Sequence, residues 1–182
     1  MRTVHDIVAF IEQQPGMMRL LEAVDKLSLP DCWIGAGFVR NAVWDALHSR
    51  VQDCGNDIDV AFFDSANLSA ERDAAIEAAL RAAQPEPRWD VKNQARMHHR
   101  NGDLPYLNTQ DAIARWPETA TAVAVRHHAG RVTLIAPHGI TDLVGLIVRP
   151  TPAFVSKSDV IANRVRTKGW QSRWPRLTVL AE

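Results

Sequence analysis

The sequence predicts an α/β (α+β) fold in which helices flank a small mixed β-sheet. Helical and strand patterns alternate from Trp33 to Val91, and each predicted strand in this stretch has one apolar face that a layer of helices can cover. The 182 residues are 46% hydrophobic and 23% charged, an average globular composition with enough apolar side chains for one core. We therefore expect one domain, residues 1–182, with an N-terminal helical hairpin (1–30), a central core (31–150) and a C-terminal extension (151–182).

The net charge and the apolar runs argue against several classes of protein. The formal net charge is zero, so the chain as a whole does not attract a polyanion, and nucleic-acid binding would need a local basic patch. No apolar run approaches the roughly 20 residues of a membrane helix, and no signal-peptide pattern opens the chain. We expect a soluble, cytoplasmic protein with no membrane partner, in which Cys32 and Cys54 remain reduced thiols.

The N-terminal segment predicts two helices. Residues 3–14 place apolar side chains at helical spacing, with Thr3 as the N-cap and Asp6 as its partner in a capping box. A Pro-Gly pair then ends the first helix, and residues 17–27 repeat the helical pattern. The two helices should form a hairpin that packs against the core.

A glycine turn follows the first predicted strand. Residues 31–34 form that strand, and Gly35-Ala36-Gly37 leads into a helix that begins at Phe38 and ends near His48. Backbone N–H groups at a helix start carry partial positive charge, and a missing Cβ lets a phosphate approach the chain closely. The turn is therefore a candidate phosphate-binding element.

The second predicted strand carries two carboxylates. After a loop at residues 50–56, residues 57–63 alternate so that Asp57 and Asp59 share one face while apolar side chains occupy the other. Two carboxylates about 7 Å apart repel each other unless a cation or several donors compensate. This cost indicates a functional site.

A helix and a third strand are predicted next. Residues 69–83 are alanine-rich and helical, prolines end that helix, and residues 88–94 alternate as a strand. Trp89 and Val91 should point inward, whereas Asp90 lies on the polar face. Asp90 is thus a candidate third carboxylate of the site.

The rest of the chain gives weaker signals. Residues 95–107 should form a polar loop near the acidic strands, and their adjacent histidines, His98 and His99, do not have the spacing of a zinc site. A helix is expected from Asn108 through Trp116. Further elements are a β-hairpin of residues 121–126 and 131–136 around Ala129-Gly130, and a segment at 139–148 whose periodicity leaves strand and short helix open.

Residues 156–175 combine basic and aromatic side chains, among them Lys157, Arg164, Arg166, Lys168, Trp170, Arg173 and Trp174. Such a stretch can bind a nucleic-acid backbone and stack bases. Its apolar positions can equally dock a C-terminal helix with a solvated basic face, which is the commoner outcome.

Taken together, GAGFVRNAVWDAL followed by NDIDVAF resembles the nucleotidyltransferase superfamily. It looks like the head of tRNA nucleotidyltransferases and poly(A) polymerases, which reads Gly-Gly-X-Val-Arg-Asp before its acidic strand. Here Ala36 stands at the first glycine and Asn41 at the aspartate. The phrase WDVKNQARMHH points more closely to a small bacterial family of nucleotidyltransferase-like proteins. The calcium-loop and Rossmann patterns do not fit, because hydrophobic strand formers follow the aspartates and a third glycine is missing.

The resemblance implies a nucleotidyltransferase fold whose residues 31–150 form a catalytic core. Asp57, Asp59 and Asp90 would be the catalytic residues and would bind Mg²⁺ (or Mn²⁺). The nucleoside triphosphate would be bound by the turn and two cations, a set consisting of Gly35, Ala36, Gly37, Arg40 and Lys92. Arg40 can equally brace the acidic strand from within, and softer candidates are Asn93, Gln94 and Arg96.

The implied reaction transfers a nucleoside monophosphate from the triphosphate to a hydroxyl of an unknown acceptor. We expect a small molecule or a protein as acceptor rather than tRNA, because the neutral chain has little surface for long-range phosphate contacts. Two alternatives remain open at this stage. One is a nucleotide-binding or regulatory module that has lost turnover, and the other is a metal-dependent phosphodiesterase.

Overall fold

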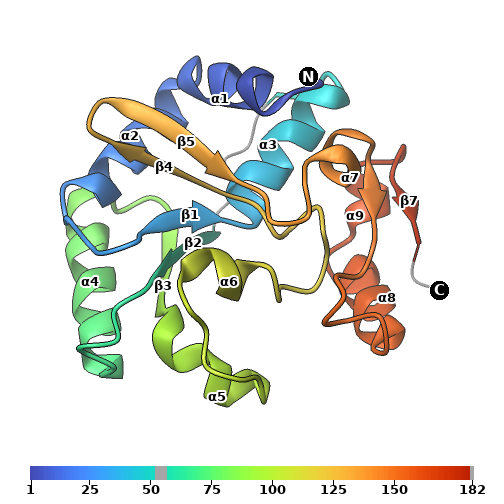
Figure 1. Ribbon diagram of the computed structural model, residues 1–182. Coiled ribbons are helices and arrows are strands. Elements are labelled where there is room, and N and C mark those ends of the chain that lie inside the picture. The colour runs from blue at the N-terminus through green and yellow to red at the C-terminus, as the bar shows by residue number, and fades with distance from the viewer. Residues whose placement is uncertain (52–56, 181–182) are drawn as a thin grey trace.

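The computed structural model describes residues 1–51 and 57–180. Its centre is a five-stranded sheet in the order β3-β2-β1-β4-β5 (Figure 1). The strands are β1 (Trp33–Gly35), β2 (Asp57–Phe62), β3 (Arg88–Asn93), β4 (Ala124–His128) and β5 (Arg131–Ile135). The β2–β3 pair is parallel, whereas β1–β2, β1–β4 and β4–β5 are antiparallel. The expected mixed sheet is confirmed.

Helices surround this sheet. They are α1 (Val4–Glu12), α2 (Pro15–Asp25), α3 (Gly37–Leu47), α4 (Ala70–Ala83), the 3₁₀ turn η1 (Gln94–Arg96), α5 (Met97–Asn101), α6 (Thr109–Ile113), α7 (Thr141–Val144), α8 (Ser158–Thr167) and α9 (Trp170–Arg173). A second, two-stranded sheet consists of β6 (Ile147–Val148) and β7 (Thr178–Val179). None of the helices in the described ranges is both long and apolar enough to span a membrane.

The two faces of the sheet are covered differently. The inward side chains of β2 and β3, such as Ile58 and Trp89, belong to the main core, which also takes the apolar faces of α1, α2 and α3. On the opposite face a smaller cluster joins Trp33 to Ile113 of α6, with Trp116 packed beside it. Because α6 covers only part of this second face, the polar ends of β2 and β3 remain accessible on it.

The C-terminal helices pack on α3 through tryptophan side chains. The Trp44 ring meets Trp170 at a centroid distance of 5.7 Å and Trp174 at 5.1 Å, both edge to face. The Trp174 indole also donates a hydrogen bond to Asp45 at 2.8 Å. Of the two possibilities for residues 156–175, docked helices are the ones observed, and a basic face remains beside them.

Several predicted elements are confirmed and others are wrong. The capping box of Thr3 and Asp6 is present, and the β4–β5 hairpin lies where its turn predicts. The predicted loop at 95–107 is wrong at its start, where η1 and α5 form because Asn93 accepts a hydrogen bond from the Ala95 N–H.

Three shorter stretches complete the comparison with prediction. The helix expected from Asn108 through Trp116 is shorter, ending at Ile113. Residues 139–148 contain both open alternatives, α7 and then β6. Cys32 is a free thiol, while Cys54 and most of the predicted loop at 50–56 lie outside the described residues.

Candidate active site

Three carboxylates come together at the polar end of the β2–β3 pair. Along β2 the exposed Asp57 and half-buried Asp59 alternate with fully buried apolar residues. The parallel ladder sets Asp59 opposite Asp90 of β3, and Asp57 opposite Arg88. All three carboxylates line one cavity of about 410 Å³. The expected position of Asp90 on the strand next to the acidic pair is therefore observed.

The electrostatic surroundings of the three carboxylates differ. Burial and, after it, the neighbouring Asp90 charge raise the pKa of Asp59 to about 6, against the opposing effect of Arg40. Asp57 forms an exposed ion pair with Arg88 at 3.5 Å. Asp90 is paired with the ammonium group of Lys92. Asp59 is thus the carboxylate that burial and like charge leave least compensated.

The oxygen donors of this cluster suit a hard divalent cation such as Mg²⁺. Within residues 1–51 and 57–180, however, no three Cys, His, Asp or Glu side chains already converge in a metal-binding arrangement. The pairs with Arg88 and Lys92 hold Asp57 and Asp90 in their present positions. The donor set therefore fits the ion chemically, and full ligation requires these two side chains to exchange their partners.

The glycine turn has a packing role that the sequence did not indicate. A Cβ on Gly35 would lie 2.6 Å from the Trp116 ring and 3.2 Å from the Val123 carbonyl oxygen, so this glycine is needed for packing. Ala36 has φ 52° and ψ −120°, a conformation that favours glycine. Ala36 and Gly37 line the cavity of the three carboxylates, whereas Gly35 does not.

Arg40 is buried and hydrogen-bonded within the protein. Its Nη1 donates to the Thr121 hydroxyl at 2.8 Å, and its Nε and Nη2 donate to Asn41 Oδ1. The guanidinium also lies 4.3 Å from the centre of the Trp170 ring. Burial lowers the pKa of Arg40 to about 10, so it remains charged at neutral pH. These contacts favour the bracing role, although Arg40 also lines the cavity.

Two of the softer candidates have structural partners. The buried Asn93 donates to the carbonyl oxygens of Asp64 and Asn67 and accepts from the Asp64 N–H. Arg96 is paired with the buried Asp73. These contacts fix the end of β3 to the segment after β2, so Asn93 and Arg96 support the site rather than line it.

A second cavity, of about 300 Å³, shares two of the three aspartates with the first. Asp59 and Asp90 line both cavities. The second is bordered by Lys92 and Gln94 of the predicted set and by Met97, Arg100, Asn101 and Trp116. Of the two adjacent histidines, His98 is buried and stacks on His99 at a centroid distance of 3.9 Å, and neither lines this cavity.

Three cations at the site were not predicted from the sequence motifs. Arg164, Lys168 and Arg173 of the C-terminal segment line the first cavity together with the three aspartates. The basic and aromatic stretch at 156–175 was the available signal, but its position relative to residues 57–90 depends on how α8 and α9 pack on α3. The site is therefore built from both ends of the chain.

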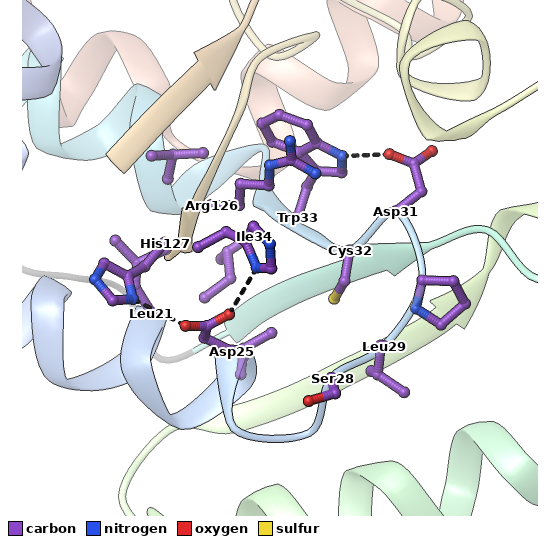
Figure 2. A pocket seen from close by; sticks show the side chains of 14 residues that line it. Leu21, Asp25, Ser28, Leu29, Asp31, Cys32, Trp33, Ile34, Arg126 and His127 are labelled. Carbon is purple, nitrogen blue, oxygen red and sulfur yellow. Dashed lines mark hydrogen bonds and ion pairs between the residues drawn. The ribbon is translucent and has the colours of Figure 1, made fainter. Parts of the chain in front are cut away.

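Another cavity, of about 300 Å³, lies between α2 and the β1–β4 pair. Figure 2 shows Asp25 directed toward the His127 imidazole, whose Nδ1 lies 3.1 Å from an Asp25 carboxylate oxygen. The Nδ1 of His128 lies 3.4 Å from the other oxygen. The Cys32 thiol lines the same cavity, and burial raises its pKa to about 12. None of the predicted catalytic or nucleotide-binding residues lines it.

The sheet, the acidic strands and the glycine turn together define a nucleotidyltransferase head. A family model described as nucleotidyltransferase matches residues 22–179, and the chain belongs to this family. Comparison with curated proteins finds no match. An NMR structure of a CCA-adding enzyme head domain is 33% identical, with a TM-score of 0.83, and the alignment covers 97% of this chain and 95% of that one.

Longer CCA-adding enzyme chains share the fold. The Thermotoga maritima enzyme in complex with tRNA is 16% identical with a TM-score of 0.57, and the alignment covers 98% of this chain and 42% of that one. The Bacillus stearothermophilus enzyme in complex with CTP is 16% identical with a TM-score of 0.50, over 85% of this chain and 39% of that one. The chain thus spans about two fifths of these enzymes.

Proposed function

We propose that the protein is a metal-dependent nucleotidyltransferase that transfers a nucleoside monophosphate from a nucleoside triphosphate to an acceptor hydroxyl. The observation that carries the proposal is the register of β2 and β3, which brings Asp57, Asp59 and Asp90 to one cavity that several cations also line. Membership of the nucleotidyltransferase family supports it. Structural neighbours in complex with ATP and with CTP support a nucleoside triphosphate as donor.

Asp57, Asp59 and Asp90 would hold Mg²⁺ or Mn²⁺. The bound ion would supply the positive charge that neutralises the triphosphate and activates the acceptor hydroxyl. Ala36 and Gly37 would lie against phosphate oxygens at the start of α3, where backbone N–H groups favour negative charge.

The two cavities suit the two sides of an in-line displacement. Attacking and leaving oxygens lie on opposite sides of the reacting phosphorus, and two cavities share Asp59 and Asp90. The cation-lined cavity would take the leaving pyrophosphate, since Arg164, Lys168 and Arg173 border it. The smaller cavity, with Trp116 and the amide side chains of Gln94 and Asn101, would take the acceptor. Its size and the zero net charge favour a small molecule or a protein side chain over bulk tRNA.

A label-transfer assay tests the proposal. The protein is incubated with Mg²⁺, a panel of α-labelled nucleoside triphosphates and cell extract fractions, and acceptor labelling and pyrophosphate release are both followed. The Asp59→Asn variant should lose transfer, whereas Glu71→Gln, an exposed carboxylate on α4, should retain it. Triphosphate binding with no transfer to any fraction would instead support the turnover-deficient module. Release of monophosphate to water would support the phosphodiesterase.

A further inference from the structure

Glu118 is a fully buried carboxylate on the segment between α6 and β4. Both of its oxygens face Arg164 of α8, with Nε at 2.5 Å from Oε1 and Nη2 at 3.4 Å from Oε2. The Arg164 side chain is 29% exposed and lines the cavity of the three aspartates, whereas Glu118 does not line it. Glu118 thus orients the Arg164 guanidinium, which borders the site, without lining the cavity itself.

The same short segment also fixes Arg40. Thr121 accepts a hydrogen bond from Arg40 Nη1 at 2.8 Å, and the Thr121 N–H donates to the Glu118 carbonyl oxygen at 2.9 Å. The Glu118 charge favours the charged form of Arg40, whereas Arg164 disfavours it. Glu118 therefore offsets the repulsion between two arginines that border one cavity.

Fold stability alone is a weak reason for this arrangement. Removing a carboxylate and a guanidinium from water carries a large desolvation penalty, and apolar side chains of similar size often stabilise a fold as well or better. What the pair provides is direction, since a guanidinium has five N–H donors in a rigid fork. Nε and Nη2 face Glu118. The remaining donors have no hydrogen-bond partner among the described residues, so they can bind an anion with little further loss of side-chain freedom.

We propose that Glu118 is a positioning residue that holds Arg164 against the polyphosphate of the donor nucleotide. This inference rests on the proposed function. It gives the C-terminal segment a defined part in donor binding, because Arg164 reaches the site from α8 and is oriented by a residue 46 positions earlier in the chain. Glu118 acts through Arg164 and does not contact the nucleotide.

The test measures binding, so that it does not depend on knowing the acceptor. Calorimetry would follow a nonhydrolysable nucleoside triphosphate with Mg²⁺ on the parent and on Glu118→Gln, Arg164→Gln and the double variant. We expect each single variant to bind at least about tenfold more weakly, and the double variant to bind no more weakly than Arg164→Gln, because residues that act in one unit are not additive. Arg166→Gln, an exposed change on the same helix, should leave binding unchanged.

A further variant approaches the pair from its exposed side. Arg164→Lys keeps the charge and loses the fork, so it should bind nearly as weakly as Arg164→Gln, with a melting temperature close to that of the parent. If Glu118→Gln does not fold, the affinity of Arg164→Lys tests whether the fork of Arg164 is needed for nucleotide binding. Parent-like affinity in Arg164→Lys, parent-like affinity in a folded Glu118→Gln, or additive losses in the double variant would each overturn the inference.

The Asp59→Asn variant separates this inference from the proposed function. If the parent and Asp59→Asn bind the Mg²⁺ nucleotide equally while Arg164→Gln does not, the metal site is wrong and the role of Glu118 stands. If Asp59→Asn loses binding while the pair variants keep it, the reverse holds. If the parent binds no triphosphate at all, both are wrong.

Discussion

Asp59 of β2 lies directly opposite Asp90 of β3 in a parallel ladder. Like charges at opposed positions of neighbouring strands are destabilising, and here burial adds to the cost by raising the pKa of Asp59 to about 6. The repulsion is present in the protein without any ligand. It gives the site a pH dependence with a definite sign.

We expect the metal-free protein to lose stability as the pH rises from about 4 to above 6. The folded-state pKa of Asp59 is above its unfolded value, so the folded protein binds more protons in this window and unfolding becomes easier as they leave. The loss is at most about 3 kcal/mol, since one pKa unit corresponds to about 1.4 kcal/mol. Urea unfolding in chelator at pH 4.5 and pH 7 would measure it. Asp59→Asn should show a smaller loss, and an equal loss in both proteins would contradict the assignment.

Magnesium should raise the melting temperature of the parent protein more than that of Asp59→Asn. A ligand at a hundredfold excess over its dissociation constant stabilises the native state by about 2.7 kcal/mol, and Asp59→Asn removes a charged donor from the proposed site. Melting curves with millimolar Mg²⁺ and a nonhydrolysable triphosphate should therefore show a larger upward shift for the parent. Equal shifts would make Asp59 a structural carboxylate.

Ala36→Gly should stabilise the protein by about 1 kcal/mol. A non-glycine residue in a sparsely populated backbone region destabilises the folded state by roughly 1–3 kcal/mol. Replacing it with glycine relieves this strain, but part of the gain is lost because glycine increases the conformational entropy of the unfolded chain. Ala36, with φ 52°, has such a backbone. The same substitution at Ala79, on the exposed side of α4, should instead destabilise by about 1 kcal/mol. If the turn is strained, thermal unfolding should show a higher melting temperature for Ala36→Gly and a lower one for the glycine substitution at Ala79.

Gly35→Ala should destabilise the protein by roughly 1–3 kcal/mol, because the new methyl group would overlap the Trp116 ring. Trp116→Leu alone should also destabilise. Combined, the two changes should cost less than the sum of their separate effects, since the smaller side chain makes room for the methyl group. Strictly additive losses of unfolding free energy would show that packing on Trp116 is not the reason for this glycine.

Asn93→Ala should destabilise the protein by roughly 2–4 kcal/mol, because it removes a fully buried amide and leaves several backbone groups, partly or fully buried, without their partner. Those groups include the carbonyl oxygens of Asp64 and Asn67 and the Ala95 N–H. Gln94→Ala, whose side-chain amide donates only to the Lys92 carbonyl oxygen among the described contacts, should cost less. Chemical denaturation of both variants would check the order.

Local patterns in the sequence determined the acidic strands. Alternation along residues 57–63 and 88–94 is enough to put Asp57, Asp59 and Asp90 on polar faces, because successive side chains of a strand point to opposite sides. The helix between these strands permits a parallel pair, which brings Asp90 beside Asp59. Fold class and the carboxylate cluster were therefore predictable from neighbouring residues.

Contacts between distant parts of the chain decided the rest. Gly35 is required by Trp116, Arg40 is held by Thr121, and Arg164 is oriented by Glu118, and none of these pairs leaves a periodic signal. A basic stretch such as residues 156–175 has the same pattern whether its cations face solvent or a cavity. The position of this stretch depends on the packing of Trp170 and Trp174 against Trp44. Burial of these apolar rings fixes the orientation of the helices, and the orientation of the helices determines where the charged side chains lie.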